Sequence, residues 1–190
     1  MTTPASEHRG PLEALGLGDP ALSRIAAYLD TLAAWSPRVN LTGARTAKER
    51  VLVLVGDVVA AARLPQAGPL IDVGSGNGSP GLVLALLRDD LEVTLLEPRA
   101  RRWAFLREAA RAAGRGGVHV LRRRHDAYDG PAAATVTLRA LALPLGELAP
   151  LVRTQGRVIV FGGEPECSPG FEATREGDGL PGGVAVFRRS

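Results

Sequence analysis

One segment constrains the fold of this chain more than any other: residues 70–81, which read Leu-Ile-Asp-Val-Gly-Ser-Gly-Asn-Gly-Ser-Pro-Gly. A short apolar run followed by glycines and a helix-start signal predicts a buried strand that turns directly into a helix. Such a turn places unpaired backbone N–H groups at the carboxyl edge of a sheet. Gly74, Gly76 and Gly78 allow positive φ and let a ligand approach the backbone closely. The segment therefore predicts a site for a nucleotide or nucleoside ligand.

Helical patterns without strand patterns precede this turn. Apolar residues repeat at helical spacing over residues 22–32, and Thr46 with Glu49 forms a capping-box pattern that opens a second helix. A linker that contains proline and glycine then leads to the first strand. We therefore expect an N-terminal helical extension over residues 1–66 and a second domain over residues 67–190.

Strand and helix patterns alternate through the second domain, which predicts an α/β fold with a largely parallel, Rossmann-like sheet. A loop rich in Gly, Pro and Glu, residues 162–183, returns into the last strand, which we expect to be antiparallel. The predicted strands cover residues 70–73, 92–96, 118–121, 134–138, 157–161 and 184–188, and the predicted helices cover residues 81–88, 98–113 and 145–152.

Composition narrows the class of protein. With 45% hydrophobic residues the chain is globular rather than disordered, and no apolar run approaches the roughly 18 to 20 residues of a membrane helix. Residues 1–10 lack the apolar core of a signal peptide. Cys167 is the only cysteine, which leaves no pair for a disulfide or a multi-thiolate metal site. We therefore expect a cytoplasmic protein with no membrane contact and no metal.

Positive charge is concentrated in one stretch, although the net charge is only +3. Residues 99–124 hold nine arginines against a single acid, Glu108. This stretch is compatible with a nucleic-acid partner, although a GC-rich genome would produce the same arginine bias without any function. Arg122, Arg123 and Arg124 follow the third predicted strand at the ligand edge, where we predict contacts to nucleic-acid phosphates.

Two acidic residues decide which cofactor the glycine turn favours. Residues 76–81 alone satisfy the dinucleotide pattern. However, Asp72 precedes the first glycine, where a carboxylate repels a pyrophosphate but attracts the amino group of S-adenosylmethionine. Glu97 ends the second strand, where an acid can accept both ribose hydroxyls. The pair favours S-adenosylmethionine. The alternatives are that Asp72 is an ordinary turn acid, that Glu97 is an ordinary strand-end acid, and that the protein is a nicotinamide dehydrogenase.

Three segments resemble one known family. Trp35-Ser-Pro-Arg-Val-Asn-Leu-Thr42, the turn Asp72–Gly81 and Leu138-Arg-Ala-Leu-Ala142 resemble the bacterial ribosomal RNA small subunit methyltransferase G family, also called glucose-inhibited division protein B. The resemblance runs from about Ala21 to Gly163. It implies a class I methyltransferase fold and transfer of a methyl group from S-adenosylmethionine to N7 of a guanine in 16S ribosomal RNA, as free RNA or in the 30S subunit.

The resemblance also implies roles for individual residues. Gly74 and Ser79 match cofactor contacts of the turn, and His125 with Asp126 matches the pair that frames the adenine. Asp126 is placed after the third strand to accept a hydrogen bond from the adenine amino group. Arg139 matches an arginine at the edge between cofactor and substrate, where its guanidinium can hold guanine O6 or the cofactor carboxylate. We therefore predict Arg139 as both a cofactor-binding and a catalytic residue.

The chain departs from the family in its substrate half, so we expect a diverged member. Residues 53–58 lack an Arg-His pair that is usual there, Phe161 stands for a lysine, and Ala134 stands approximately for an acid. These departures keep two alternatives open. One is a methyltransferase with a small-molecule substrate, and the other is a module that binds cofactor and RNA with little turnover.

The chemistry of guanine N7 agrees with the residues that the chain offers. This nitrogen carries a free lone pair at neutral pH, so the reaction needs alignment rather than a general base. The stretch 138–141 lacks the Asn/Asp-Pro-Pro-aromatic pattern of amine methylation, and Cys167 lies too late to attack a cytosine. Methylation of a ring nitrogen is therefore the favoured reaction.

Overall fold

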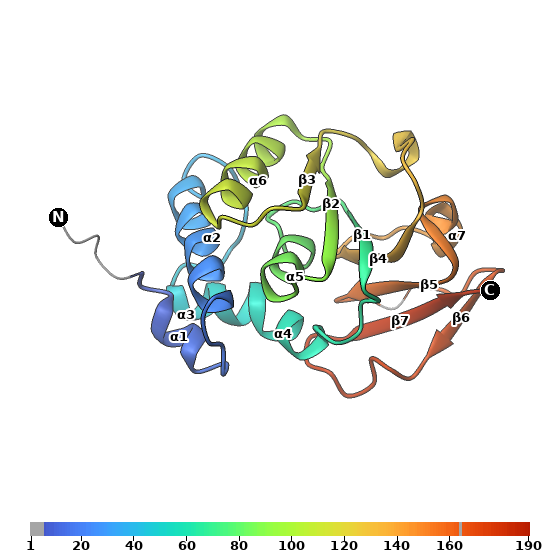
Figure 1. Cartoon of the computed structure of the whole chain (residues 1–190), viewed down its shortest axis with the longest axis horizontal. Coiled ribbons are helices and arrows are strands. Elements are labelled where there is room, and N and C mark those ends of the chain that lie inside the picture. The colour runs from blue at the N-terminus through green and yellow to red at the C-terminus, as the bar shows by residue number, and fades with distance from the viewer. Residues whose placement is uncertain (1–5, 164) are drawn as a thin grey trace.

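The structure, a computed structural model, describes residues 6–163 and 165–190 (Figure 1). Seven strands form one sheet in the order β3-β2-β1-β4-β5-β7-β6. The strands are β1 Gly68–Val73, β2 Leu91–Leu96, β3 Val118–Leu121, β4 Ala133–Arg139, β5 Val152–Phe161, β6 Phe171–Thr174 and β7 Val184–Arg189. The helices are α1 Arg9–Glu13, α2 Ala21–Trp35, α3 Ala47–Val51, α4 Asp57–Ala61, α5 Gly81–Leu87, α6 Ala100–Ala112 and α7 Leu145–Leu148.

The topology confirms the predicted class of fold. Strands β1 to β5 pair in parallel, and β7 pairs antiparallel with both β5 and β6. The strand order runs outward in opposite directions from β1 and β4. In an open parallel sheet this reversal opens a crevice at the carboxyl ends of those two strands. The glycine turn follows β1 directly, so it lies at this crevice.

Alternation along the strands divides the hydrophobic core between the two faces of the sheet. Leu70 packs with helices α2, α4, α5 and α6, whereas its neighbour Ile71 packs on the opposite face with α7. Helices α1 to α4 lie beside α5 and α6 (Figure 1). The ring centroids of Trp35 and Phe105, which join α2 to α6, are 6.0 Å apart. The extension therefore shares one core with a face of the sheet.

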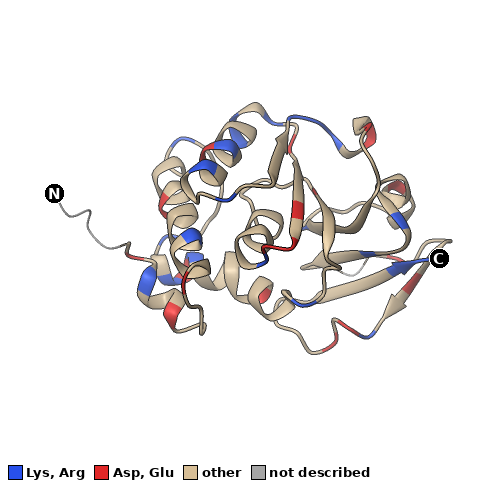
Figure 2. Cartoon of the chain, viewed as in Figure 1, with Lys and Arg blue, Asp and Glu red and all other residues tan. Residues whose placement is uncertain are grey.

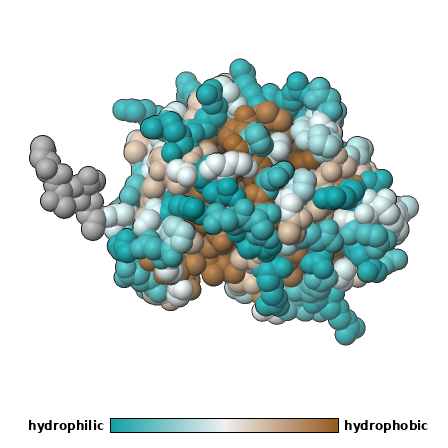
Figure 3. Space-filling view, in the orientation of Figure 1, coloured by the Kyte–Doolittle hydropathy of each residue, from teal (hydrophilic) through white to brown (hydrophobic). Residues whose placement is uncertain are grey.

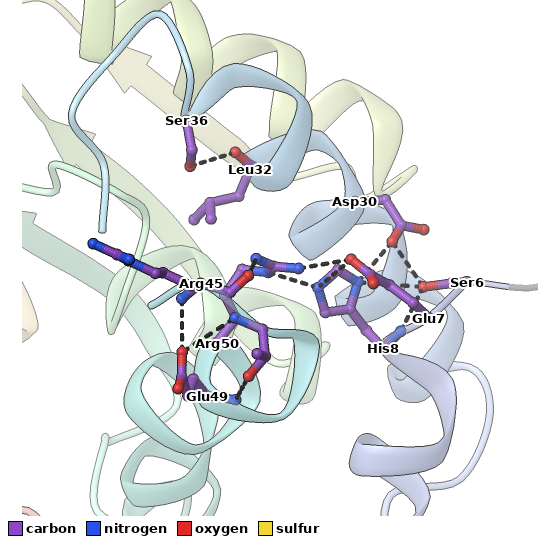
Figure 4. A network of polar contacts seen from close by, with 10 residues as sticks. Ser6, Glu7, His8, Asp30, Leu32, Ser36, Arg45, Glu49 and Arg50 are labelled. Carbon is purple, nitrogen blue, oxygen red and sulfur yellow. Dashed lines mark hydrogen bonds and ion pairs between the residues drawn. The ribbon is translucent and has the colours of Figure 1, made fainter. Parts of the chain in front are cut away.

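A polar network joins the first three helices (Figure 4). His8 is fully buried, with Nδ1 2.7 Å from Asp30 Oδ1. Arg50 Nε donates to His8 Nε2 at 2.9 Å, and another Arg50 nitrogen donates to Glu7 at 2.6 Å. Because a guanidinium can only donate, Nε2 of His8 accepts, and Nδ1 carries the proton toward Asp30. The network fixes α1, a helix that the hydrophobic pattern did not predict.

The second helix of the extension is interrupted. Thr46 and Glu49 form the predicted capping box, but residues Leu52–Gly56 form a π-helical turn between α3 and α4. The carbonyls of Val53 and Leu54 accept side-chain hydrogen bonds from Arg139 and Ser79. Such a turn frees backbone carbonyls for partners outside the helix, and π-turns are frequent at functional sites. This one faces the glycine turn and the end of β4.

Strands β5 and β6 differ from the sequence prediction, β5 in where it begins and β6 in being present at all. The helix expected to reach residue 152 ends earlier, because Val152 already pairs with Ala133 at the start of β5. The register between β4 and β5 then shifts, and Gln155 adopts a φ of 61°. Strand β6 lies inside the segment that we expected to be a loop. The sequence does not predict this strand, because its four residues include only one buried apolar side chain, Phe171. No helix among residues 6–163 and 165–190 is long and apolar enough to cross a membrane.

Candidate functional site

The glycine turn is attached to the end of β2 through its backbone. The N–H groups of Gly74 and Ser75 donate to the Leu96 carbonyl at 2.9 and 3.1 Å. Gly76 N–H donates to Glu97 Oε2 at 3.0 Å, and the other Glu97 oxygen accepts from Arg99 N–H at 2.7 Å. Glu97 is buried, yet its carboxylate has more acceptor positions than these two bonds use. The acid at the end of the second strand is therefore fixed with acceptor capacity to spare.

Asp72 lies beneath the turn rather than in an open site. Its side chain is fully buried, and Oδ1 accepts from the Thr137 hydroxyl at 2.6 Å. Oδ2 has no hydrogen-bond partner among the described residues. Burial raises the pKa of Asp72 to about 6, against the hydrogen bond from Thr137, which lowers it. A Cβ on Gly81 would lie 2.4 Å from Asp72 Cβ, so this contact requires glycine at the start of α5.

The remaining residues of the turn are braced by the helical extension. The Tyr28 hydroxyl donates to the Asn77 carbonyl at 2.9 Å, and the Asn77 amide donates to the Leu41 carbonyl at 3.1 Å. Ser79 is buried, and its hydroxyl donates to the Leu54 carbonyl at 2.6 Å. The predicted start of α5 is right, but the Ser79 side chain does not cap it. The segment Trp35–Thr42 thus reaches the turn through Leu41.

Two cavities open beside the turn, at the carboxyl ends of the strands. The smaller one, of about 260 Å³, is lined by Gly74, Glu97 and His125 among others. The larger one, of about 620 Å³, lies between the end of β4 and the loop after β5. Leu141 and Leu143 line both cavities. A Cβ on Gly74 would lie 3.0 Å from a Leu141 methyl, so glycine allows the close approach of Leu141 to the turn.

Backbone strain marks the same place. Ala140, which follows β4 and lines the larger cavity, has a φ of 49°. A residue other than glycine in the left-handed region costs free energy, and such residues cluster at functional sites. The Ala140 N–H donates to the Phe161 carbonyl at 3.3 Å, which helps to hold this conformation.

The predicted adenine pair is divided by the structure. His125 lines the smaller cavity, and its Nε2 lies 3.1 Å from Glu147 Oε2. Asp126 is exposed and pairs with Arg124 at 3.1 Å. The hydrogen bond from Arg124 holds the pKa of Asp126 below its usual value. His125 therefore faces the site, whereas the Asp126 carboxylate is engaged by its neighbour in the chain.

Acidic neighbours also engage the predicted RNA-binding arginines. Arg123 forms an ion pair with Asp129, and Arg124 forms the pair with Asp126. Arg122 is exposed and lines neither cavity. Figure 2 shows this basic stretch continuing from α6 into the chain after β3. Charge in the arginine run is therefore partly neutralised.

Arg139 is held by residues far from it in the sequence. One terminal nitrogen donates to Asp57 Oδ1 at 2.9 Å, the other donates to the Val53 carbonyl at 3.4 Å, and Cζ lies 5.1 Å from the Phe161 ring centroid. A Cβ on Gly182 would lie 2.6 Å from Asp57 Oδ2, so the loop before β7 packs on this pair. Sequence reasoning did not identify Asp57, although an acid inside an apolar helical stretch was a signal.

Comparison with known proteins places the chain in a family. The family profile described as rRNA small subunit methyltransferase G matches residues 21–167. The chain belongs to this family. A ribosomal RNA small subunit methyltransferase G of Halorhodospira halophila is 39% identical over 152 residues, which are 78% of this chain and 72% of the relative. The protein of the same name from Neisseria meningitidis serogroup C is 34% identical over 182 residues, 94% and 86% of the two chains.

Solved structures share the fold of this methyltransferase G family member at low sequence identity. A mutant of MtNAS in complex with S-adenosylmethionine is 17% identical, with a TM-score of 0.59, over 87% of this chain and 71% of that chain. A SAM-dependent methyltransferase from Aquifex aeolicus is 15% identical, with a TM-score of 0.54, over 74% and 91% of the two chains. The sheet is thus that of the class I methyltransferases.

Proposed function

We propose that this protein transfers a methyl group from S-adenosylmethionine to N7 of a guanine in 16S ribosomal RNA, free or within the 30S subunit. The observation that carries the proposal is the pair of cavities that share Leu141 and Leu143 at the carboxyl ends of the strands. A transfer reaction needs its two ligands side by side with their reacting atoms in contact, and adjoining cavities can hold them in that way. Membership of the methyltransferase G family supports ribosomal RNA as the acceptor, and the cytoplasm is the matching compartment.

The residues of the smaller cavity fit S-adenosylmethionine. The spare acceptor positions of Glu97 suit ribose hydroxyls, and His125 lies at the same cavity for the adenine. Gly74 and Gly76 have φ values of 68° and 50°, and a side chain on Gly74 would meet Leu141. When bound there, the cofactor supplies an electrophilic methyl group on its sulfonium. Asp72 lines neither cavity, so we assign it an electrostatic and structural role beneath the turn.

The larger cavity suits the acceptor base. Its described lining is mostly apolar, with Leu141, Leu143 and the prolines 144, 165 and 169. Leucine side chains and proline rings can pack on the face of a base and exclude water from the reacting atoms. Guanine N7 attacks with its own lone pair, so these residues need only align it with the methyl group. The lining therefore performs orientation rather than proton transfer.

Arg139 also lines neither cavity, but it directly precedes Ala140, which lines the larger one, and we assign it to the orientation of the two ligands at this edge. Asp57, the Val53 carbonyl and the Phe161 ring hold its side chain at the end of β4. A guanidinium fixed in this way can present a remaining donor to guanine O6 or to the cofactor carboxylate at little entropic cost. Arg139→Ala is expected to lower the rate of methyl transfer about 10- to 100-fold. Arg157→Ala, which removes a partly exposed arginine paired with Glu176, is the matched control and should leave the rate nearly unchanged.

The test is a methylation assay with mapped product. The protein is incubated with labelled S-adenosylmethionine and either 16S RNA that lacks modification or 30S subunits that lack it, and the labelled base is mapped. Label at N7 of one guanine supports the proposal. Binding of S-adenosylhomocysteine without label on either substrate contradicts it, and favours a cofactor-binding module. Label on a different ring position would retain the rRNA methyltransferase and reject the N7 assignment.

A further inference from the structure

Arginines are unevenly distributed between the two cavities. The described lining of the smaller cavity includes four of them: Arg99, Arg102, Arg123 and Arg124. The described lining of the larger cavity contains no basic side chain. A base held in the larger cavity is flanked by backbone phosphates, and that cavity has no cation for them. Arg139 directly precedes Ala140 of this cavity, but it pairs with Asp57, and the four arginines of the smaller cavity lie across the shared wall of Leu141 and Leu143.

Two of the four arginines keep their charge available. Asp129 and Asp126 balance Arg123 and Arg124. Within residues 6–163 and 165–190, neither Arg99 nor Arg102 forms an ion pair. Glu97 shares their cavity, but in the described part of the chain it forms no ion pair with either arginine, and its two hydrogen bonds come from backbone N–H groups. Two positive charges without an acidic partner among the described residues therefore face this cavity.

The structure also holds Arg102 at the mouth of the site. A terminal nitrogen donates to the Asn40 carbonyl at 3.1 Å, in the segment that braces the glycine turn. A Cβ on Gly76 would lie 3.6 Å from another terminal nitrogen of Arg102, so the guanidinium lies over the turn. Arg99 is exposed directly after Glu97 and Pro98. S-adenosylmethionine has one carboxylate and a cationic sulfonium, so it does not account for two unpaired guanidinium groups.

We propose that Arg99 and Arg102 bind the RNA phosphates that flank the target nucleotide. The RNA strand then crosses the mouth of the smaller cavity and covers the cofactor. This proposal rests on the proposed function, because it takes the target base to occupy the larger cavity. It moves the main phosphate contact from the run Arg122–Arg124 to the rim of the cofactor cavity. Because coupling between two ligands is reciprocal, RNA should also tighten the binding of cofactor.

The test compares two variants with the same change in net charge. The first is Arg99→Gln/Arg102→Gln. The control is Arg63→Gln/Arg153→Gln, which removes two exposed arginines near the amino ends of β1 and β5, at the opposite edge of the sheet. RNA affinity is measured over a range of salt with a 16S RNA fragment. S-adenosylhomocysteine affinity is measured by calorimetry with and without that RNA.

For the rim variant we expect RNA affinity to fall about 10- to 100-fold near 0.1 M salt. The slope of log K against log salt should decrease by about 1.4, which corresponds to two phosphate contacts on a single strand. S-adenosylhomocysteine affinity without RNA should stay within about twofold of wild type. The increase in S-adenosylhomocysteine affinity that RNA produces in the wild-type protein should be lost. The control variant should behave as wild type in all of these measurements.

Two results would overturn the proposal. Equal losses in the control would show an effect of overall charge, and an equal loss of S-adenosylhomocysteine affinity without RNA would make the arginines cofactor ligands. Arg99→Gln alone covers the case of a misfolded double variant, because the Arg99 side chain makes no polar contact in the described part of the chain. It should give about half the change in slope. The mapped product of the wild-type enzyme tests the proposed function separately, since RNA can bind this rim even if no methyl group is transferred.

Discussion

The glycine turn of residues 74–81 and the arginine run of residues 122–124 differ in how the structure holds them. The turn is bonded to Leu96, Glu97, Tyr28 and Leu54, which come from three separate parts of the chain. The arginines of the run are exposed, and two of them pair with acids within six residues. Both segments stand out by composition alone.

This difference shows which kind of site a sequence reveals. The function of the turn depends on backbone N–H groups and on the absence of side chains, and both are local properties. The function of an arginine depends on which acid neutralises it, and a partner depends on packing. Four substitutions test the contrast, from the largest expected effect to the smallest.

Gly81→Val should damage the turn most. The new Cβ would lie 2.4 Å from Asp72 Cβ, so either β1 or α5 must shift. We expect a loss of about 3 kcal/mol in the free energy of unfolding, measured by urea denaturation. Gly10→Ala is the control, because a Cβ there meets nothing within 4 Å. It should leave stability unchanged or raise it by less than about 1 kcal/mol. Equal stability of the Gly81 variant and the wild-type protein would contradict the close packing of Gly81 against Asp72.

Asp72→Asn should change how stability depends on pH. The folded state raises the pKa of Asp72 from 3.8 to about 6, so the folded protein binds the extra proton between these values. Wild type therefore loses stability from this group as pH rises through that window, and the variant does not. From pH 4 to pH 7 the difference in unfolding free energy should shift in favour of the variant by roughly 2 to 3 kcal/mol. Parallel curves would show that Asp72 does not titrate there.

Ser79→Ala separates a structural role from cofactor contact. It removes the hydroxyl that donates to the Leu54 carbonyl at 2.6 Å, so we expect a loss of about 1 kcal/mol. S-adenosylhomocysteine affinity should stay within a few-fold of wild type. Ser36→Ala removes a similar bond to the Leu32 carbonyl, away from the site, and is the matched control. A tenfold loss of affinity in the Ser79 variant alone would make this hydroxyl a cofactor ligand.

Asp129→Asn should have the smallest effect on the fold. It removes the partner of Arg123 in an exposed ion pair, so the midpoint of thermal unfolding should move by less than about 2 °C. RNA affinity should rise a few-fold, because the freed guanidinium gains a net charge toward phosphates. Asp90→Asn, which frees Arg88 near the amino end of β2, is the control and should not affect RNA binding. Unchanged RNA affinity in the Asp129 variant would remove Arg123 from the RNA surface.

Periodicity and local signals were enough to predict most of the fold. Burial on both faces makes strand segments such as 158–161 apolar throughout, and the capping box at Thr46 and Glu49 is complete within four residues. Strand β6 was missed because it depends on pairing with β7 rather than on its own apolar residues. The π-turn at Leu52–Gly56 was missed because carbonyl partners from β4 and the glycine turn stabilise it.

The sequence by itself determined the turn after β1, the acid after β2 and the α/β order, because each depends on residues that are adjacent in the chain. Only the tertiary structure decided the partners of the charged groups. Arg139 and Asp57 lie 82 residues apart and have no shared local pattern. Among the described residues, the structure likewise gives Arg99 and Arg102 no acidic partner, while Asp129 and Asp126 pair with Arg123 and Arg124. An ion pair depends on distance in space, which a one-dimensional pattern of charges does not contain.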